Sequence, residues 1–334
     1  MKKFCLLFVC LVALFVAPAQ ALACTPTGFF RDAINMTAAL LNPVGTVTGT
    51  VNATGCNIAI YYDHDGTGGT VKGADVFGSN YFGVLVNGDA GTVNVDLLAN
   101  SIHDIGEVPH NGTQHGVAVY YRGFFLVSNV TGKISGNTIT DYQKGGVVAN
   151  GAGVQVTVTD NTVTGDGHVS FIAQNGIQIG YGASASAMRN SVSGNSYDGA
   201  GDGSASAGIL VVGGPGYGIC PDGNDCPFTV NAKINDNVLT NNDVGIYLSN
   251  VEQDFSAPNT ATNIKAVNND ITDDVCFNVS YQAGISDVGN NDKMVNARIS
   301  GAGYVGCTTI YNPSGAKVDA DTSFTNRPKV HAIK

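Results

Sequence analysis

Imidazole, carboxylate and amine side chains gather in one part of the sequence, between residues 102 and 176. Four of the six histidines lie there, and the candidates for acid–base chemistry are His103, Asp104, Glu107, His110, His115, Lys144, Asp166 and His168. A lyase or epimerase acting on a polysaccharide needs a base that removes the proton next to a uronate carboxylate, and a group that neutralises this carboxylate. We expect His115 to be the base, with Lys144 and either Gln174 or Asn175 as neutralising groups.

Two other interpretations of this cluster remain open. A glycosidase needs two carboxylates on either side of the scissile bond, and Asp104 or Glu107 opposite Asp166 would supply them. Asp273 and Asp274 form a more distant acidic pair. The same histidines would also serve a protein without catalytic activity, by packing loops and bonding turns.

Glutamine recurs two or three residues before a glycine, at Gln114, Gln143, Gln174 and Gln282. One interpretation is a ladder of amides that satisfies buried backbone groups. The other is a row of side chains that bind sugar hydroxyls, with neighbouring polar residues on the same surface. The candidates for substrate binding are Gln114, Gln143, Gln174, Asn175 and Tyr142.

Calcium is the one cofactor that the sequence suggests. Asp63-His64-Asp65-Gly66 alternates oxygen ligands before a glycine, but it lacks the downstream bidentate Glu of an EF-hand loop. A solvated turn is the better interpretation of this segment. The sequence contains no phosphate-binding loop, no GxSxG elbow and no HExxH zinc motif.

A repeat along most of the chain must position these side chains. An Asn recurs two residues before an aliphatic residue, and each such Asn is followed later by a Gly that precedes Ile or Val. The Asn position is held by Asn100, Asn137, Asn161, Asn190, Asn237 and Asn269. Short β-branched runs with Gly and Asn turns, repeating about every 20–25 residues, indicate a parallel β-helix in which each turn of the coil is one rung. Asn residues at one corner of successive rungs would form an amide ladder.

The spacing within the repeat predicts where the coil carries loops. The Gly follows closely after Asn137 and Asn237, whereas longer insertions follow Asn100, Asn161, Asn190 and Asn269. A second corner is also enlarged, at Cys220–Cys226 and at 251–259. Insertions at one corner project from the same side, so a groove between the two ridges is the expected binding surface.

These repeated residues resemble the right-handed parallel β-helix superfamily that contains the pectate lyases. The resemblance covers about residues 44–311 and implies an all-β fold, a single-stranded right-handed parallel β-helix of about nine rungs. It also implies a protein that acts on carbohydrates, although the shared signals are structural. The Arg-x-Lys of the polygalacturonase branch is not visible, which lowers the hydrolase interpretation.

The ends of the coil need caps, because they expose apolar core and unpaired backbone groups. In the capping segment, residues 24–43, Phe30, Ile34, Thr37 and Leu41 fall on one face of an amphipathic helix from Phe29 to Leu41. Residues 312–334 are expected to form a C-terminal cap or tail, because the repeat stops after Tyr311.

The N-terminus has the features of a signal peptide, residues 1–23. Lys2 and Lys3 precede an apolar stretch that is too short for a membrane span, and Ala21-Leu22-Ala23 is a cleavage site. The mature protein would be secreted or held at the cell surface, and a lipid on Cys24 is the alternative. Export permits disulfides, and the six remaining cysteines would pair as Cys24–Cys56, Cys220–Cys226 and Cys276–Cys307.

Composition limits the partners. The net charge of the 334-residue chain is −10 and no basic stripe is evident in the linear sequence, which argues against nucleic acid. We therefore expect a monomer that binds an extracellular polysaccharide, with lyase or epimerase chemistry ahead of hydrolysis. The alternative is a structural or adhesive protein of the surface or matrix, favoured by the absence of Trp from the sequence. Sugar sites usually stack on aromatic rings, and Tyr120, Tyr121, Tyr142 and Tyr281 could substitute for Trp.

Overall fold

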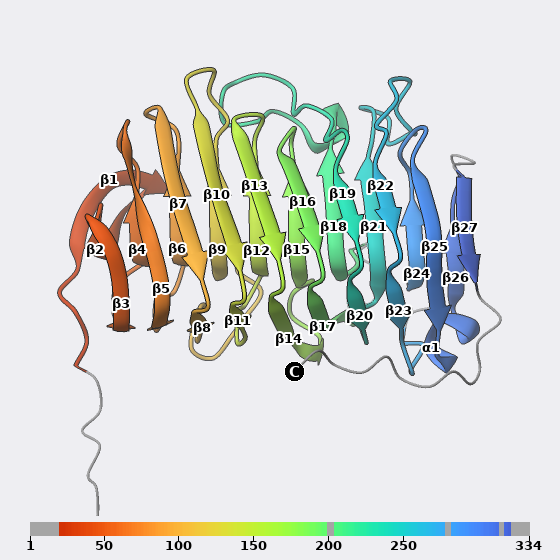
Figure 1. The fold of residues 1–334 in the computed structure, drawn as a ribbon, viewed down its shortest axis with the longest axis horizontal. Helices are drawn as coiled ribbons and strands as arrows, with labels where there is room; N and C mark the ends of the chain where they lie inside the picture. Colours follow the sequence, from red (N-terminus) through yellow and green to blue (C-terminus); the bar gives the residue numbers. More distant parts are fainter. Residues whose placement is uncertain (1–19, 199–203, 278–281, 314–316, 322–334) are drawn as a thin grey trace, which may run out of the picture.

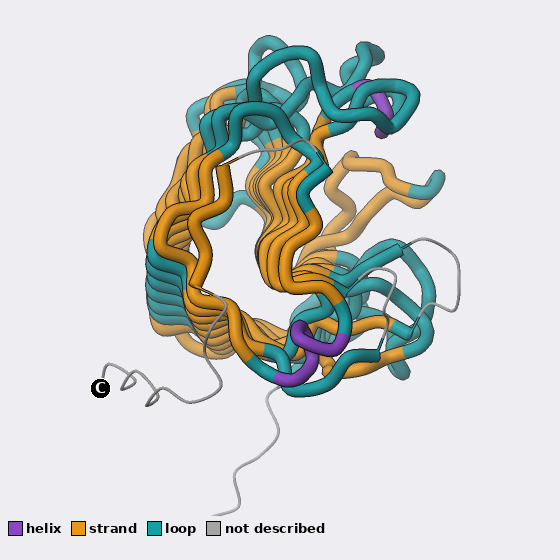
Figure 2. Tube along the Cα trace, turned by 90° about the vertical axis from the view of Figure 1, so that its right-hand side faces the viewer, coloured by secondary structure: helices purple, strands orange, loops and turns teal. Residues whose placement is uncertain are grey.

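The computed structural model describes residues 20–198, 204–277, 282–313 and 317–321, and shows a solenoid of stacked strands (Figure 1). Most of the predicted signal peptide, most of the predicted C-terminal tail and Tyr281 lie outside the described residues. Two long sheets face each other along the coil axis, with the hydrophobic core between them (Figure 2).

Sheet A contributes one strand to each rung, and apart from β1 its strands are parallel. In spatial order they are β1 (Thr25–Arg31), β2 (Ile34–Leu41), β4 (Ile58–Tyr62), β6 (Phe82–Asn87), β9 (Val117–Arg122), β12 (Gly145–Asn150), β15 (Asn175–Gly180), β18 (Ala207–Gly213), β21 (Val244–Asn250), β24 (Ala283–Asp287) and β26 (Thr308–Tyr311).

Sheet B contributes a longer and a shorter strand to most rungs, separated by a sharp corner. Its strands are β3 (Gly45–Asn52), β5 (Thr67–Phe77), β7 (Thr92–Leu98), β8 (Ser101–His103), β10 (Asn129–Ser135), β11 (Thr138–Ile139), β13 (Val154–Thr159), β14 (Thr162–Val169), β16 (Ser184–Met188), β17 (Ser191–Tyr197), β19 (Lys233–Asn235), β20 (Val238–Thr240), β22 (Lys265–Val267), β23 (Asp270–Thr272), β25 (Lys293–Ser300) and β27 (Lys317–Asp321). The described helices are the 3₁₀ turn η1 (Pro215–Tyr217) and the short α1 (Ala302–Gly306).

Alternation along each strand builds the core. In β13, Val154, Val156 and Val158 are buried, while the residues between them are exposed. Successive rungs pair in register, so each inward Val or Ile stacks on its equivalent one rung away, about 4.8 Å along the coil. Burying these apolar columns is the main stabilising contribution to the fold.

The predicted asparagine ladder is present. Asn137 Nδ2 donates to Asn161 Oδ1 at 2.9 Å and to the Leu97 carbonyl oxygen at 3.0 Å. Asn161 repeats this pattern with Asn190, and the same bonds continue from Asn100 to Asn269. The ladder satisfies backbone groups that the tight corner would otherwise leave buried without partners.

The helix predicted from Phe29 to Leu41 is wrong, because this segment forms the antiparallel hairpin of β1 and β2. Asp32 and Ala33 have positive φ angles of 51° and 63°, the backbone of a tight two-residue hairpin turn. Met36 and Ala38 are buried at alternate positions, which is the period of a strand. The hairpin packs on the outer face of sheet A, where Phe29 meets Tyr61 with ring centroids 6.0 Å apart.

The three predicted disulfides are present, at Cys24–Cys56, Cys220–Cys226 and Cys276–Cys307. Because its sulfur is bonded to Cys56, Cys24 in this state cannot also carry a lipid. At the other end, β27 pairs with β25 and carries sheet B beyond Tyr311. Within the described ranges, no helix has the length and apolar character needed to cross a membrane.

Candidate functional site

The predicted acid–base residues lie together on a ridge beside sheet A. We call it the histidine ridge. It consists of the loops at 104–116, 141–144 and 170–174, which precede β9, β12 and β15, and of the neighbouring strand β14. His115 Nε2 is 2.8 Å from Glu107 Oε1, and His110 Nδ1 is 2.7 Å from Asp166 Oδ2. His103 lies between Asp104 and Asp75, at 2.6 and 3.0 Å. Each of these imidazoles is therefore paired with a carboxylate.

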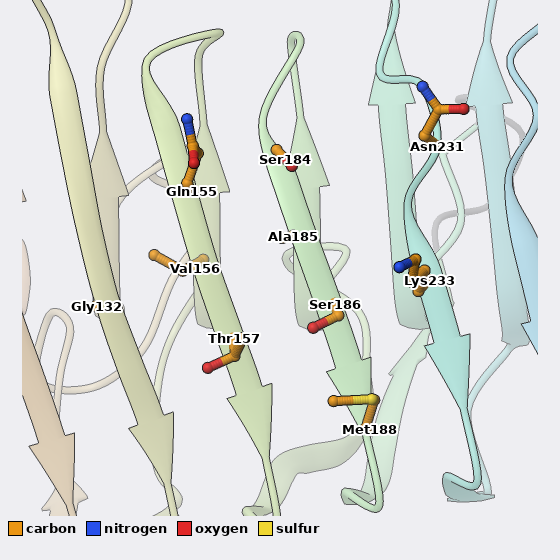
Figure 3. Close-up of a pocket in the computed structure, with 10 residues that line it drawn as sticks. All are labelled: Gly132, Gln155, Val156, Thr157, Ser184, Ala185, Ser186, Met188, Asn231 and Lys233. Carbon is orange, nitrogen blue, oxygen red and sulfur yellow. The ribbon is translucent and has the colours of Figure 1, made fainter.

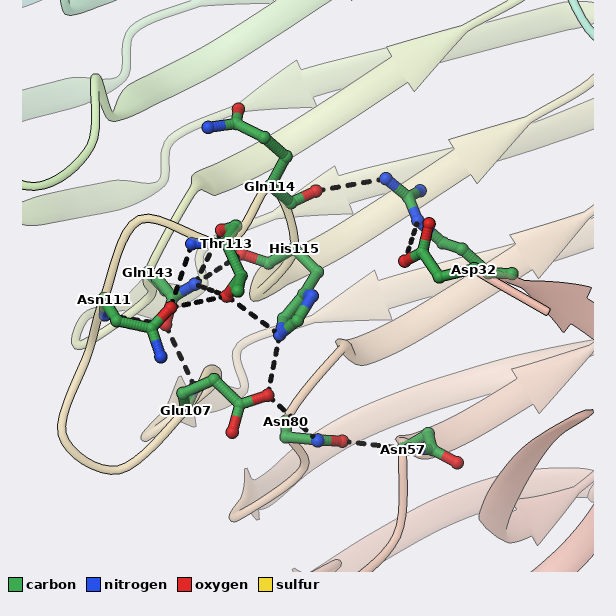
Figure 4. Close-up of polar contacts among 10 residues, drawn as sticks. Asp32, Asn57, Asn80, Glu107, Asn111, Thr113, Gln114, His115 and Gln143 are labelled. Atoms are coloured by element: carbon green, nitrogen blue, oxygen red, sulfur yellow. Dashed lines mark hydrogen bonds and ion pairs between the residues drawn. The ribbon is translucent and has the colours of Figure 1, made fainter. Parts of the chain in front are cut away.

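His115 is enclosed by its own loop (Figure 4). Its side chain is 8% exposed, and its ring stacks on Tyr81 with centroids 3.9 Å apart. The same Nε2 atom that meets Glu107 lies 3.2 Å from Thr113 Oγ1. Arg31 of the N-terminal hairpin donates to the Gln114 carbonyl oxygen at 3.0 Å. The expected base thus holds the loop in place.

Gln143 and Gln174 are also internal. Gln143 Oε1 accepts from the backbone N–H groups of Glu107 and Asn111, and its Nε2 donates to the Thr113 carbonyl oxygen (Figure 4). Gln174 Nε2 donates to the Tyr142 carbonyl oxygen at 2.7 Å. These amides bond loop backbone, as in the first of the two interpretations of the glutamine repeat.

The remaining predicted binders are divided between the interior and the surface. Tyr142 is fully buried, and its hydroxyl donates to Asn195 Oδ1 at 2.7 Å. Asn175 is 7% exposed and accepts from the Ala207 N–H. Gln114 is exposed on its loop, and its Nε2 donates to the Gly112 carbonyl oxygen.

The ridge carries perturbed titrating groups. Burial lowers the pKa of Lys144 to about 8, and its Nζ donates to the Ala173 carbonyl oxygen at 2.9 Å. The hydrogen bond with Asp166 raises the pKa of His110 against the opposing effect of burial. His168 bonds Ser196 Oγ at 2.8 Å and stacks on Phe277. A half-buried amine with a lowered pKa can act as a base near neutral pH.

Two ridges flank the outer face of sheet A, and the N-terminal hairpin projects between them (Figure 2). The second ridge contains η1 and the Cys220–Cys226 loop. Between the hairpin and this second ridge lies a cavity of about 450 Å³, which we call the aromatic cleft. Six aromatic side chains line it: Phe29, Phe30, Tyr120, Phe124, Tyr181 and Tyr217.

The rings of the cleft form a connected set. Tyr181 meets Phe124 at 6.2 Å and Tyr217 edge-on at 6.1 Å between centroids. Burial raises the pKa of Tyr181 to about 12, so its phenol stays protonated at neutral pH. The hydroxyl of Tyr217 lies 2.5 Å from Ser249 Oγ, which orients its ring. Phe30 is 63% exposed at the mouth of the cleft.

Arg122 is held at the floor of the cleft. Its guanidinium lies over the rings of Phe29 and Phe124, 5.2 and 5.4 Å from their centroids. It also forms an ion pair with Asp89, at 2.5 Å. Burial raises the pKa of Asp89, and the neighbouring Arg122 opposes this shift. A planar cation fixed on three sides keeps its remaining donors at a defined position for a ligand.

Sequence reasoning missed most of this cleft because its walls come from five segments that are distant in sequence, near residues 30, 122, 150, 181 and 217. Tyr120 was the one lining residue proposed for stacking, and the Cys220–Cys226 loop was expected as a ridge. An available signal was the spacing of Tyr120, Arg122 and Phe124, since alternate residues of a strand share a face.

The described residues contain no group of three or more His, Cys, Asp or Glu side chains arranged for a metal. In the segment considered for calcium, Asp63 accepts from Asn42 Nδ2 at 2.7 Å, and Asp65 accepts from the Thr92 N–H at 2.8 Å. Both carboxylates stabilise turns. No protein-family model matches the chain, and no similar curated protein or solved structure is found.

Proposed function

We propose that this protein is a secreted or cell-surface monomer that binds an extracellular polysaccharide in the aromatic cleft. We further propose that its solenoid is a right-handed parallel β-helix similar to those of the pectate lyase superfamily. The supporting observation is a cavity of about 450 Å³ lined by six aromatic rings, two arginines and an asparagine.

This lining matches the chemistry of a sugar. The C–H faces of a pyranose ring are apolar and stack on aromatic side chains, while hydroxyl groups need donors and acceptors at the edges. Tyr181 and Phe124 supply neighbouring ring faces, and Arg122 supplies donors beside them. Binding by ring stacking requires no charge on the ligand, so neutral glycans are suitable ligands.

Affinity electrophoresis with a panel of neutral and uronate-containing polysaccharides tests this proposal. Tyr181→Ala should weaken binding about tenfold, since a stacked ring contributes about 1–1.5 kcal/mol. Tyr311→Ala is the matched control, because Tyr311 is 54% exposed on the last strand of sheet A. Equal affinity of Tyr181→Ala and the wild type for every ligand that binds would disprove the cleft as the site.

A second candidate activity is proton abstraction from a uronate, and the lowered pKa of Lys144 favours it. The neutral amine would be the base, so activity should rise with pH through about 8. Unsaturated products would be followed by ultraviolet absorbance, and Lys144→Met should abolish them. Activity that persists in Lys144→Met, with an unchanged pH profile, would rule out this role.

A further inference from the structure

A column of lysines stands on the outer face of sheet B, whereas the aromatic cleft lies on the outer face of sheet A. Lys233 of β19 pairs with Lys265 of β22, which pairs with Lys293 of β25. The backbone register continues to Lys317 of β27. Lys233, Lys265 and Lys293 are exposed. Parallel strands lie about 4.8 Å apart, so positive charge repeats at this interval along the coil.

The column is cationic on a protein whose net charge is −10. In the described part of the chain, no carboxylate lies within 4.0 Å of the three exposed lysine amines. The arginines differ: Arg189 pairs with Asp160 and Arg298 pairs with Asp270. Like charges on directly opposite residues of neighbouring strands repel and destabilise the sheet. The column is thus an arrangement that folding alone does not favour.

Hydroxyl and amide side chains continue this column toward the N-terminus. Lys233 pairs in register with Ser186, and Ser186 pairs with Thr157 (Figure 3). These three residues line a shallow cavity of about 380 Å³ together with Gln155, Ser184 and Asn231. A ligand lying along the coil would therefore meet ammonium groups on the later rungs, then the hydroxyl groups of Ser186 and Thr157, and then the exposed Lys133 of β10.

We propose that this face of sheet B, which we call the lysine face, binds a linear polyuronate whose chain runs parallel to the coil axis. Its carboxylates meet the lysines, and its ring hydroxyls bond Thr157, Ser186 and their neighbours. A regular row of single ammonium charges suits a polymer that carries one carboxylate per sugar. The lysine face is separate from the aromatic cleft, so the two sites can be tested independently.

The chemistry of the lysine face favours a carboxylate polymer over a nucleic acid. Sites for single-stranded nucleic acid stack bases on aromatic rings, and the lining of the sheet B cavity contains none. Phosphate recognition commonly uses the planar fork of arginine, whereas this column contains lysines, which act as point charges. A monodentate carboxylate is well matched by such a charge.

Titration calorimetry of the secreted protein with oligogalacturonate, at low salt, tests the proposal. The triple variant Lys233→Gln/Lys265→Gln/Lys293→Gln should bind about tenfold more weakly, and its affinity should depend less on salt. The same three positions changed to Arg should keep the affinity, because the charge is retained. Lys72→Gln, an exposed lysine of β5, should bind like the wild type.

A second probe separates charge from general sugar binding. Fully methyl-esterified oligogalacturonate has the same rings without the charges, and the triple Gln variant should bind it as the wild type does. Equal oligogalacturonate affinity in the wild type and the triple variant would overturn the proposal. So would loss of this affinity in Tyr181→Ala alone, which would place the uronate in the cleft, or tighter binding of single-stranded DNA than of oligogalacturonate.

Discussion

The two outer faces of the coil share one scaffold and differ in almost everything that a ligand would meet. Sheet A carries aromatic and aliphatic residues on its outer face, and a hairpin and two ridges of loops surround it. The outer face of sheet B carries short polar side chains and lysines, and its cavity lies on the flat strand surface. The inward-facing residues of both sheets are mostly Val and Ile, which stack in columns and form one common core. The fold therefore constrains the inner positions and leaves the outer ones free for different ligands.

The largest loss of stability is expected from a change in the asparagine ladder, because both faces of the coil depend on it. Asn161→Ala would remove bonds to Asn137, Asn190 and the Ile134 carbonyl oxygen, and leave buried groups unsatisfied. We expect a loss of about 4 kcal/mol in the free energy of unfolding. Urea unfolding measures it, with exposed Asn129→Ala as the control. A loss below about 1 kcal/mol would show that the ladder is not the shared support of the two faces.

Arg122→Gln should affect the sheet A face alone. Removing the guanidinium leaves Asp89 partly buried without its ion pair, which should cost about 3 kcal/mol at pH 7. The pKa of Asp89 is already raised by burial and would rise further, so protonation relieves the cost and the deficit should shrink at pH 5. Urea unfolding at both pH values tests this. A deficit that grows on acidification would contradict the assignment.

The corner that joins β24 to β25 should respond to pH. Burial raises the pKa of Asp292 to about 7, and the pKa of neighbouring Asp287 is also raised. A carboxyl group whose pKa is raised in the folded state binds its proton more tightly there than in the unfolded chain. The resulting stabilisation is fully present below the pKa of the unfolded chain, near 4, and is lost as pH rises through about 7. The free energy of unfolding should fall by about 3.5 kcal/mol from pH 4 to pH 7.5, since each pKa unit corresponds to about 1.4 kcal/mol.

Asp292→Asn provides the matched variant for this pH effect. It keeps an oxygen that can accept from Thr262 and from the Ile264 N–H, but it does not titrate. The dependence on pH should become shallower in this variant, as followed by urea unfolding across the same range. Parallel curves for variant and wild type would assign the effect to other carboxyls, such as Asp273, whose pKa burial raises to about 6.

The smallest effect concerns the lysine face. Without ligand, the triple change of Lys233, Lys265 and Lys293 to Gln should raise stability by about 0.5 kcal/mol, because neighbouring like charges are removed. Thermal unfolding at low salt would detect the increase, and high salt should abolish the difference between variant and wild type. A destabilised variant would mean that the lysines have attractive partners and that the comparison of the two faces needs revision.

Much of the scaffold could be predicted because its signals are periodic. The asparagines at Asn100 to Asn269 recur at one corner and form the expected ladder, and the six cysteines outside the predicted signal peptide form the three expected disulfides. The helix at Phe29–Leu41 was wrong because apolar residues spaced for a helix face also fit a strand when a tight turn intervenes. Asp32 and Ala33 adopt that turn; Asp is common in turns, but Ala has no turn preference, so the pair is a weak signal.

The candidate sites were harder to predict, since they depend on which side chains bond to each other. His115 and Gln143 lie in the region where chemistry was expected, but their side chains bond residues of the 104–116 loop. The cleft joins Phe29, Arg122 and Tyr217 across nearly 200 residues of sequence. Predicting the lysine column requires the register of strands that are separated by loops of different lengths. The net negative charge of the chain gives no indication of it.

The hairpin at the N-terminus also bears on whether copies of this coil can join end to end. A parallel coil ends in strands whose unpaired N–H and C=O groups could template the first rung of another molecule, and repeated addition would give a fibre. In sheet A the outermost strand is β1, which runs antiparallel to the rest. At this edge of sheet A an incoming last rung would meet a reversed hydrogen-bonding pattern. The reversal of a single strand thus disfavours end-to-end joining through sheet A, whereas the first strand of sheet B, β3, keeps the parallel direction.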